Sequence, residues 1–152
     1  MTDRVIPLLL RDRTLEDEAF IYSSWLKSYH QNSVAKFTPN TIYFPHQTQL
    51  IKYLLENEKI VISCFPEDPS EIIGYCVYNI VSDALIIHYI YIKNMHRNGK
   101  FAYDIVSSLL PKKDGNLIIA TSITDNFCNI RNKIPNAKIV FDPYYITQKR
   151  IY

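Results

Sequence analysis

The chain has 152 residues, of which 47% are hydrophobic and 21% are charged, and its formal net charge is +2. This composition is globular and excludes an intrinsically disordered chain, and so small a charge does not predict nucleic-acid binding. The length indicates one domain, residues 1–152, that can bury a substantial core.

The cysteines and the start of the chain bear on its location. Cys64, Cys76 and Cys128 have no metal-site spacing, so we expect reduced residues of a cytoplasmic protein and no bound metal. In MTDRVIPLLLRDRT, an apolar run of six residues lies between charges. That run is too short for a signal peptide or a membrane span. We therefore expect a monomer or homodimer with no membrane partner.

The first half of the chain predicts one strand and two helices. Val5–Leu10 is apolar enough for a strand, and Thr14 is typical of a helix N-cap. The helix after it has apolar residues at helical spacing, at Leu15, Ala19, Tyr22, Leu26 and Tyr29. The polar segment Gln31–Tyr43 predicts a loop or a broken helix, after which Pro45 can open a second helix. That helix has one apolar stripe, formed by Leu50, Ile51, Leu54 and Leu55.

The second half predicts five strands and one helix. The strands are expected at Ile60–Phe65, Ile72–Val81, Ala84–Ile92, Leu117–Ile123 and Ala137–Phe141. A helix is expected at Ala102–Leu110. The turn cluster PEDPS and the pair Ser82–Asp83 join the first three of these strands into an antiparallel meander. This order of elements indicates an α/β chain with a strand–turn–helix unit after the meander.

The strand–turn–helix unit, IIHYIYIKNMHRNGKFAYDI, indicates an anion site. The first N–H groups of a helix have no partner within the helix, and with the helix dipole they attract negative charge. Arg97 and Lys100 add positive charge, and Gly99 lets the backbone bend tightly. A diphosphate is a suitable ligand for such a strand-to-helix turn. The alternative is an ordinary solvated basic turn.

The run IKNMHRNGKFA resembles the coenzyme-binding motif of the GCN5-related N-acetyltransferases, the GNAT family. In that family a strand ends in an aliphatic residue, and five positions later begins the pattern Arg/Gln-x-x-Gly-x-Gly/Ala. The backbone amides of this motif bind the pyrophosphate of acetyl-coenzyme A (acetyl-CoA). Ile92 fits the aliphatic position, Arg97 the first motif position and Ala102 the last. Ile105 and Val106 fit the hydrophobic pair that usually follows.

The resemblance covers nearly the whole chain and implies a fold and a co-substrate. It implies an α/β (α+β) fold whose mixed, mostly antiparallel central sheet is flanked by helices and splays between the fourth and fifth strands. It implies acetyl-CoA as the acetyl donor, bound by Tyr91, Ile92, Arg97, Asn98, Gly99, Lys100, Phe101, Ala102 and Asn126. The segments SSWLKSY, IIGYCVY and HYIYIK together also resemble small acetyltransferase-like proteins of tailed bacteriophages.

One motif position departs from the family. Lys100 stands at the central glycine, and Gly99 lies one residue early. A side chain at this position either crowds the pyrophosphate or binds it through its ammonium group.

His88 is the candidate general base. Side chains alternate along a strand, so Ile86, His88, Ile90 and Ile92 are expected on one face. The position of His88 resembles one where some members of the family carry a catalytic-site histidine. An imidazole can take a proton from an ammonium group near neutral pH, directly or through water. The alternative is a core histidine that is hydrogen-bonded to backbone.

The resemblance also assigns the remaining catalytic groups. The backbone N–H of Ile92 would donate to the oxyanion. Asn126 fits an asparagine that commonly contacts coenzyme A. Lys133 stands where the family often has a tyrosine that protonates the thiolate. Tyr144 and Tyr145 are candidate substitutes or ordinary strand aromatics.

The function implied is direct transfer of acetyl from acetyl-CoA to a primary amine of a protein or small molecule. Direct transfer needs no covalent intermediate, and Cys128 has no obvious activating partner. The alternative is a catalytically silent module that keeps the fold and binds a host or partner protein. The segment Gln31–Pro45, where the acceptor is expected to bind, does not identify the acceptor.

Overall fold

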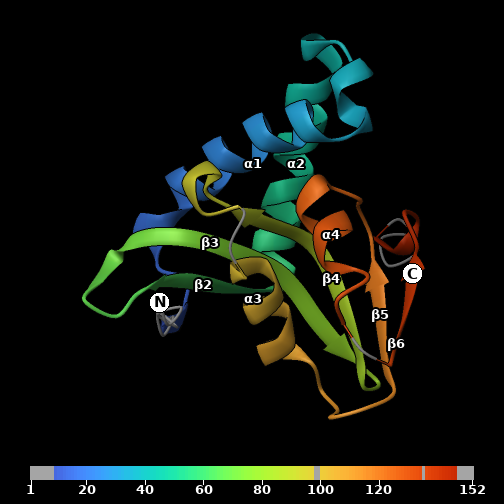
Figure 1. Cartoon of the computed structure of the whole chain (residues 1–152). Coiled ribbons are helices and arrows are strands. Elements are labelled where there is room, and N and C mark those ends of the chain that lie inside the picture. The colour runs from blue at the N-terminus through green and yellow to red at the C-terminus, as the bar shows by residue number, and fades with distance from the viewer. Residues whose placement is uncertain (1–8, 98–99, 135, 147–152) are drawn as a thin grey trace.

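A computed structural model describes residues 9–97, 100–134 and 136–146. Its centre is a six-stranded sheet in the order β1-β2-β3-β4-β5-β6 (Figure 1). The strands are β1 Leu9–Asp12, β2 Lys59–Phe65, β3 Asp68–Val81, β4 Ala84–Ile92, β5 Asn116–Ala120 and β6 Ala137–Phe141. Neighbouring strands are antiparallel from β1 to β4 and parallel from β4 to β6. The predicted mixed, mostly antiparallel sheet is confirmed.

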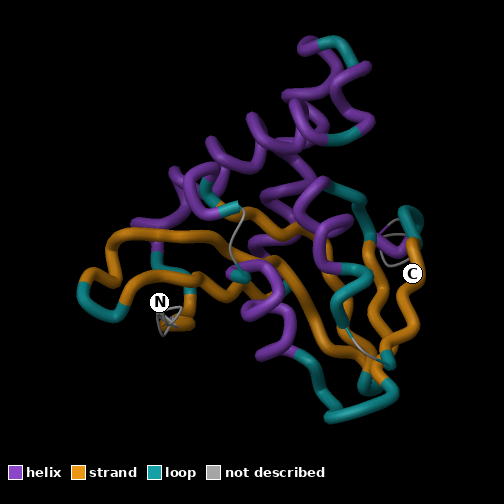
Figure 2. Tube along the Cα trace, viewed as in Figure 1, coloured by secondary structure: helices purple, strands orange, loops and turns teal. Residues whose placement is uncertain are grey.

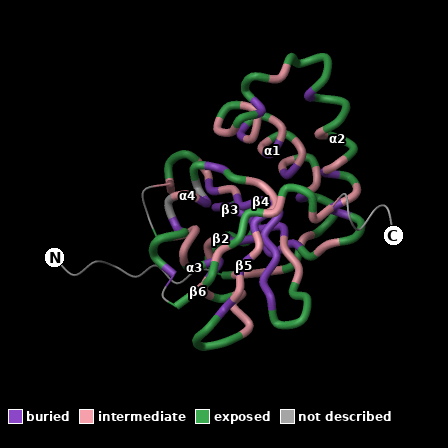
Figure 3. Tube along the Cα trace, turned by 90° about the vertical axis from the view of Figure 1, so that its right-hand side faces the viewer, coloured by how far each residue is buried: buried purple, intermediate pink, exposed green. Residues whose placement is uncertain are grey.

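Helices cover both faces of this sheet (Figure 2). The α-helices are α1 Glu18–Asn32, α2 Asn40–Asn57, α3 Phe101–Leu109 and α4 Asp125–Ile130, and short 3-10 helices lie at η1 Leu15–Asp17, η2 Val34–Phe37 and η3 Asn94–His96. Ile21 of α1 and Leu54 of α2 pack in the core of one face, here the α1/α2 face. Val106 of α3 and Phe127 of α4 pack in the core of the other, the α3/α4 face. Buried positions gather along β3 and β4 between them (Figure 3).

The N-terminal half departs from the prediction in two places. β1 continues two residues past Leu10, while residues 5–8 lie outside the described residues. The segment Gln31–Tyr43 is mostly helical, because α1 extends to Asn32, the second residue of this segment, and η2 follows. The second helix begins at Asn40 after Pro39, so Pro45 lies inside α2 and does not open it. Pro45 is exposed and lies in the second turn of α2, where it has no N–H to donate to the carbonyl four residues earlier, so the helix forms with one backbone hydrogen bond fewer.

The C-terminal half follows the prediction more closely. β4 and β6 have the predicted bounds, and α3 is displaced by one residue toward the N-terminus. β3 begins at Asp68, so only two residues of the PEDPS cluster separate it from β2. β5 ends at Ala120 and not at Ile123, and α4 occupies a segment expected to be a loop. The side chain of Thr124 caps α4 by accepting a backbone N–H of its first turn.

A β-bulge interrupts β4 at His88. Val77 of β3 lies opposite Tyr89, and Tyr78 lies opposite Ile87, so His88 is an extra residue in the ladder. A bulge of this kind disturbs the alternation of side chains and bends the strand locally.

The bulge makes the predicted alternation wrong beyond His88. Ile90 and Ile92 pack in the core of the α3/α4 face, whereas Tyr89 packs on the α1/α2 face. His88 lines a cavity on the α1/α2 face. His88 and Tyr89 therefore share a face, and Ile92 points to the other side of the sheet.

β4 and β5 part immediately before His88. Their parallel ladder runs from the pair Ala84–Leu117 to the pair Ile87–Ala120. One further bond follows, from the Thr121 N–H to the Ile87 carbonyl, at 3.0 Å. β4 continues to Ile92, and no later ladder pair joins the two strands in the described residues. The predicted splay between the fourth and fifth strands is confirmed.

The N-terminal cap that links β1 to α1 is held by Asp17. Its carboxylate accepts hydrogen bonds from the Arg11 guanidinium at 2.7 and 2.9 Å and from the Thr14 N–H at 2.8 Å. Thr14 is the N-cap of η1, and α1 begins directly after η1 with Asp17 as its own N-cap. The hydrogen bond from Arg11 lowers the pKa of Asp17 to about 2.

We expect Asp17→Asn to lower the free energy of unfolding at pH 7 by about 2 kcal/mol. Because the pKa of Asp17 is lower in the folded chain than in the unfolded chain, this stabilisation is complete well above pH 4 and is lost as the pH falls toward 2. At pH 3 about half of the difference should remain. Urea denaturation of both proteins at pH 7 and pH 3 measures it, and an equal difference at both values would contradict the assignment.

No helix in the described ranges combines the length and apolar character needed to cross a membrane.

Candidate active site

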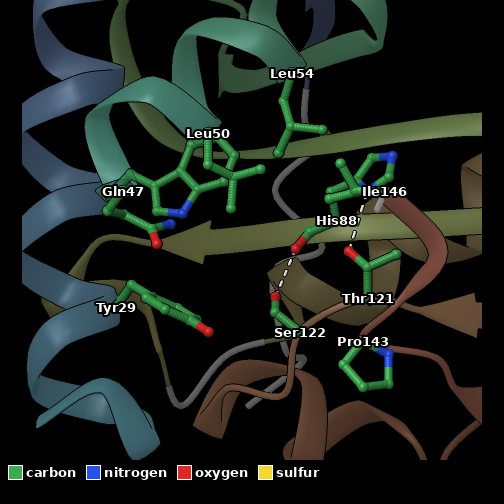
Figure 4. Close-up of a pocket in the computed structure, with 10 residues that line it drawn as sticks. Tyr29, Gln47, Leu50, Leu54, His88, Thr121, Ser122, Pro143 and Ile146 are labelled. Carbon is green, nitrogen blue, oxygen red and sulfur yellow. Dashed lines mark hydrogen bonds between the residues drawn. The ribbon is translucent and has the colours of Figure 1, made fainter. Parts of the chain in front are cut away.

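A cavity of about 250 Å³ lies on the α1/α2 face where β4 and β5 part. This inner cavity is lined by Trp25, Tyr29, Gln47, Leu50, Leu54, His88, Thr121, Ser122, Pro143 and Ile146. Figure 4 shows the Thr121 and Ser122 hydroxyls directed toward His88 from one side, with Leu50 and Leu54 on the other. The inner cavity thus combines apolar walls with polar side chains, which are Thr121 and Ser122 beside His88 and, further away, Gln47 and Tyr29.

His88 is buried, and a polar side chain lies close to each of its ring nitrogens. Nδ1 lies 3.0 Å from Thr121 Oγ1, at hydrogen-bond distance. Nε2 lies 3.5 Å from Glu58 Oε1, an ion-pair distance. The backbone carbonyl of His88 accepts a hydrogen bond from Ser122 Oγ at 2.6 Å. Thr121 and Glu58 thus place one polar side chain beside each nitrogen of the ring.

Glu58 is part of the site, although the sequence analysis did not single it out. It caps the C-terminus of α2, and its side chain is 2% exposed. Its other oxygen, Oε2, accepts a hydrogen bond from the Asn79 amide at 2.5 Å. A glutamate at a helix C-terminus is unfavourable for the helix dipole, which makes Glu58 unusual but does not identify its partner.

Thr121 and Ser122 were missed for a different reason. The sequence predicts both residues within the strand Leu117–Ile123, yet β5 ends at Ala120, immediately before them. Hydroxyl residues directly after the carboxyl end of a parallel strand are well placed for a ligand, because ligands bind at such ends. That signal depends on knowing where the strand ends.

Of the two tyrosines predicted as catalytic, only Tyr145 lies near His88. The ring centroids of His88 and Tyr145 are 6.2 Å apart. Tyr144 is 68% exposed and does not line the inner cavity. Lys133, at the position where the family often has a tyrosine, is exposed.

Arg97 extends back along the end of β4. Its Nε donates to the Ile92 carbonyl at 2.9 Å, and Nη2 lies 3.5 Å from Ser28 Oγ of α1. The guanidinium also lies over the Tyr91 ring, 5.8 Å from its centroid. Arg97 thus joins the end of β4 to α1, next to the predicted pyrophosphate loop.

Three of the other predicted coenzyme-binding residues lie at the start of α3. Lys100 is exposed and occupies the N-cap position. Phe101 and Ala102 form the first turn and pack partly against the α3/α4 core. Asn98 and Gly99 lie outside the described residues. Asn126 lies in the first turn of α4, and its side chain is likewise outside them.

The backbone N–H of Ile92 lies on the edge of β4 that β5 no longer covers. The N–H of Lys93 donates to the Ile73 carbonyl of β3 at 2.8 Å. Backbone N–H groups alternate in direction along a strand, so the N–H of Ile92 points away from β3. It is therefore directed into the space between the parted strands.

A wider groove of about 570 Å³ adjoins the inner cavity. This outer groove shares Tyr29, Thr121, Ser122 and Pro143 with the inner cavity. Its remaining walls come from residues 31–37, from residues 123–128 and from Phe141. The segment expected to carry the acceptor site thus forms one wall of the outer groove.

Burial raises the pKa of one thiol in the α3/α4 core and of one phenol beside the inner cavity. Burial raises the pKa of the Cys76 thiol, so a nucleophilic thiolate is disfavoured there. Burial also raises the pKa of Tyr29, which keeps this phenol neutral beside the inner cavity. Within the described residues, no three His, Cys, Asp or Glu side chains gather as metal ligands would.

No family model matches the sequence, and no curated protein matches it. Solved structures match its fold. A GNAT-family acetyltransferase from Staphylococcus aureus has a TM-score of 0.52 at 12% identity, covering 84% of this chain and 79% of that one. A possible acetyltransferase from Clostridium difficile has a TM-score of 0.50 at 13% identity, covering 95% and 86%. The PaiA N-acetyltransferase from Thermoplasma acidophilum, solved with coenzyme A, has a TM-score of 0.47 at 13% identity, covering 68% and 69%. The fold of this chain is that of the GNAT acetyltransferases.

Proposed function

We propose that this chain is an N-acetyltransferase that transfers acetyl from acetyl-CoA directly to a primary amine. The observation that carries the proposal is the buried imidazole of His88 at the point where β4 and β5 part. A hydroxyl-lined cavity and an outer groove lie beside it. Together these features offer a base, an open strand edge and a path for an acceptor.

The residues fit acetyl-CoA at two places. The N–H of Ile92 is directed toward the parted strands, where it would donate to the thioester carbonyl oxygen. The N–H groups at the start of α3, with the charge of Lys100 and Arg97, would hold the pyrophosphate. Bound acetyl-CoA would supply the thioester that the amine attacks.

His88 is the proposed base. An ammonium acceptor must lose a proton before its lone pair can attack, and imidazole suits this near neutral pH. Tyr145, beside the His88 ring, is the proposed proton donor to the leaving thiolate. Cys128 lines the outer groove, but direct transfer needs no covalent intermediate on its thiol.

The proposal predicts that acetyl-CoA binds and stabilises the native chain. At a concentration 100 times its dissociation constant, it should raise the melting temperature by about 5–10 °C. Arg97→Glu should weaken binding about tenfold or more, because it replaces a cation beside the phosphate loop with an anion. Lys113→Glu makes a similar charge change in the exposed turn after α3 and should bind like the parent. Calorimetry of the three proteins checks this, and equal affinities for all three would contradict the assignment of the phosphate loop.

A non-catalytic binding module with this fold is the second candidate. The observation that favours it is Lys100 at the N-cap of α3, where the family motif has glycine. If the ammonium of Lys100 binds phosphate, Lys100→Gly should weaken acetyl-CoA binding slightly and make it less sensitive to salt. If Lys100→Gly instead creates binding that the parent lacks, the parent is such a module.

The acceptor class and the biological setting remain predictions. The acceptor is a primary amine of a small molecule or protein, and the resemblance to phage proteins makes a host protein one candidate. A single domain, a cytoplasmic location and a monomer or homodimer are predicted on the sequence alone.

A further inference from the structure

The imidazole of His88 is enclosed by protein at both nitrogens. The His88 side chain has 0% exposure. Thr121 Oγ1 lies 3.0 Å from Nδ1, and Glu58 Oε1 lies 3.5 Å from Nε2. An acceptor amine in the outer groove would therefore meet Thr121 before it met a ring nitrogen.

Glu58 determines which ring nitrogen carries the proton. An ionised carboxylate can only accept hydrogen bonds, and Oε2 already accepts one from the Asn79 amide. The group that faces Oε1 should therefore be an N–H, which places the proton of a neutral His88 on Nε2. Nδ1 is then an acceptor, so the Thr121 hydroxyl donates its proton to Nδ1.

Thr121 connects the imidazole to the acceptor space. Thr121 lines both the inner cavity and the outer groove, whereas His88 lines the inner cavity and not the outer groove. The position of Thr121 is fixed, because its N–H donates to the Ile87 carbonyl at 3.0 Å. A hydroxyl that donates to Nδ1 keeps its oxygen lone pairs free to accept from an ammonium group.

We infer that Glu58, His88 and Thr121 form a proton relay, in which the Thr121 hydroxyl takes the proton of the acceptor ammonium. This inference rests on the proposed function. The N–H bond of the ammonium breaks, and its proton passes to Thr121 Oγ1. The original hydroxyl proton passes at the same time to Nδ1, so the hydroxyl is restored.

The products of this step are a neutral amine and an imidazolium. The positive charge on His88 lies between Thr121 and the Glu58 carboxylate, which offsets it. Glu58 is thus a positioning residue that acts through His88, while Thr121 contacts the substrate. No covalent bond to the protein forms.

Three substitutions test the relay. Thr121→Val removes the hydroxyl at nearly constant volume, Thr121→Ser restores it, and Glu58→Gln removes the charge. Thr48→Val is the control, since it makes the same change at an exposed position of α2. Steady-state kinetics use acetyl-CoA with benzylamine and with polylysine as acceptors.

We expect Thr121→Val to lower kcat by about 100-fold, with the KM for acetyl-CoA unchanged. Thr121→Ser should retain kcat within about threefold, and Glu58→Gln should lose about tenfold or more. If Thr121→Val keeps full kcat while His88→Ala is inactive, the relay is wrong and the proposed function stands. An acetyl group found on Thr121 by mass spectrometry would also overturn it, since the hydroxyl would then be a nucleophile.

A second readout needs no acetyl transfer. Nitrogen-15 NMR of the histidine side chains in the free protein reports which ring nitrogen carries the proton. The relay requires the Nε2–H form of neutral His88 in the parent, and a mixture of both forms in Glu58→Gln. An Nδ1–H form in the parent would overturn the relay. If neither acceptor is acetylated and acetyl-CoA does not bind, the proposed function fails, and this readout still decides the arrangement of the three residues.

Discussion

Replacement of His88 by alanine should lower the turnover of acetyl transfer by about 10²–10⁴-fold, the usual contribution of a general base. The affinity for acetyl-CoA should remain nearly unchanged. The imidazole faces the inner cavity on the α1/α2 face, whereas the proposed phosphate site is at the start of α3. The variant is therefore expected to lose turnover while it keeps its affinity for acetyl-CoA.

The alanine variant also leaves the buried Glu58 carboxylate without its imidazole partner, so its fold must be checked. His88→Gln keeps a hydrogen-bonding side chain of similar size, and it should lose turnover to a similar extent. His46→Ala, at an exposed position of α2, should behave like the parent. Full activity of a folded His88→Ala across pH 5–8, the range in which histidine titrates, would show that another base is used.

The position of His88 was predictable from the sequence, but its orientation was not. The bounds of β4 follow from its continuous apolar run, which places His88 four residues before the end of that strand. Simple alternation then put His88 on the face of Ile92. The bulge reverses this, because one extra residue changes the face of every later side chain.

The partners of His88 were not predictable for a topological reason. Glu58 lies at the end of α2, and Thr121 lies 33 residues after His88. The pairing of β2 and β3 brings Glu58 beside Asn79, and the parallel pairing of β4 and β5 brings Thr121 beside His88. Neither proximity leaves a local pattern in a single sequence. Tyr144 and Tyr145 are equal candidates in the sequence. Only the path of the chain after β6 shows that Tyr145, and not Tyr144, lies beside His88.

The end of β4, which presents the Ile92 N–H, depends on a glycine in the neighbouring strand. Gly74 of β3 lies opposite Ile92. A Cβ atom at Gly74 would lie 2.3 Å from the Tyr91 carbonyl oxygen and 2.7 Å from Ile92 Cδ1. The first contact is with backbone, which cannot rotate away as a side chain can. β3 and β4 could accept a side chain here only by moving apart.

We therefore expect Gly74→Ala to lower the free energy of unfolding by about 2 kcal/mol or more, as overpacking does, and the melting temperature by about 4–8 °C. The folded fraction should also bind acetyl-CoA more weakly, because the Ile92 N–H shifts with the strand. Gly115→Ala is the matched control. Gly115 has a φ of 69° but nothing within 4 Å of an added Cβ, so it should lose only about 1 kcal/mol from backbone strain and keep the parent's affinity. Thermal melts and calorimetry compare the two variants. If Gly74→Ala is no less stable than Gly115→Ala, the close approach of β3 to β4 is not what holds the Ile92 N–H toward the space between β4 and β5.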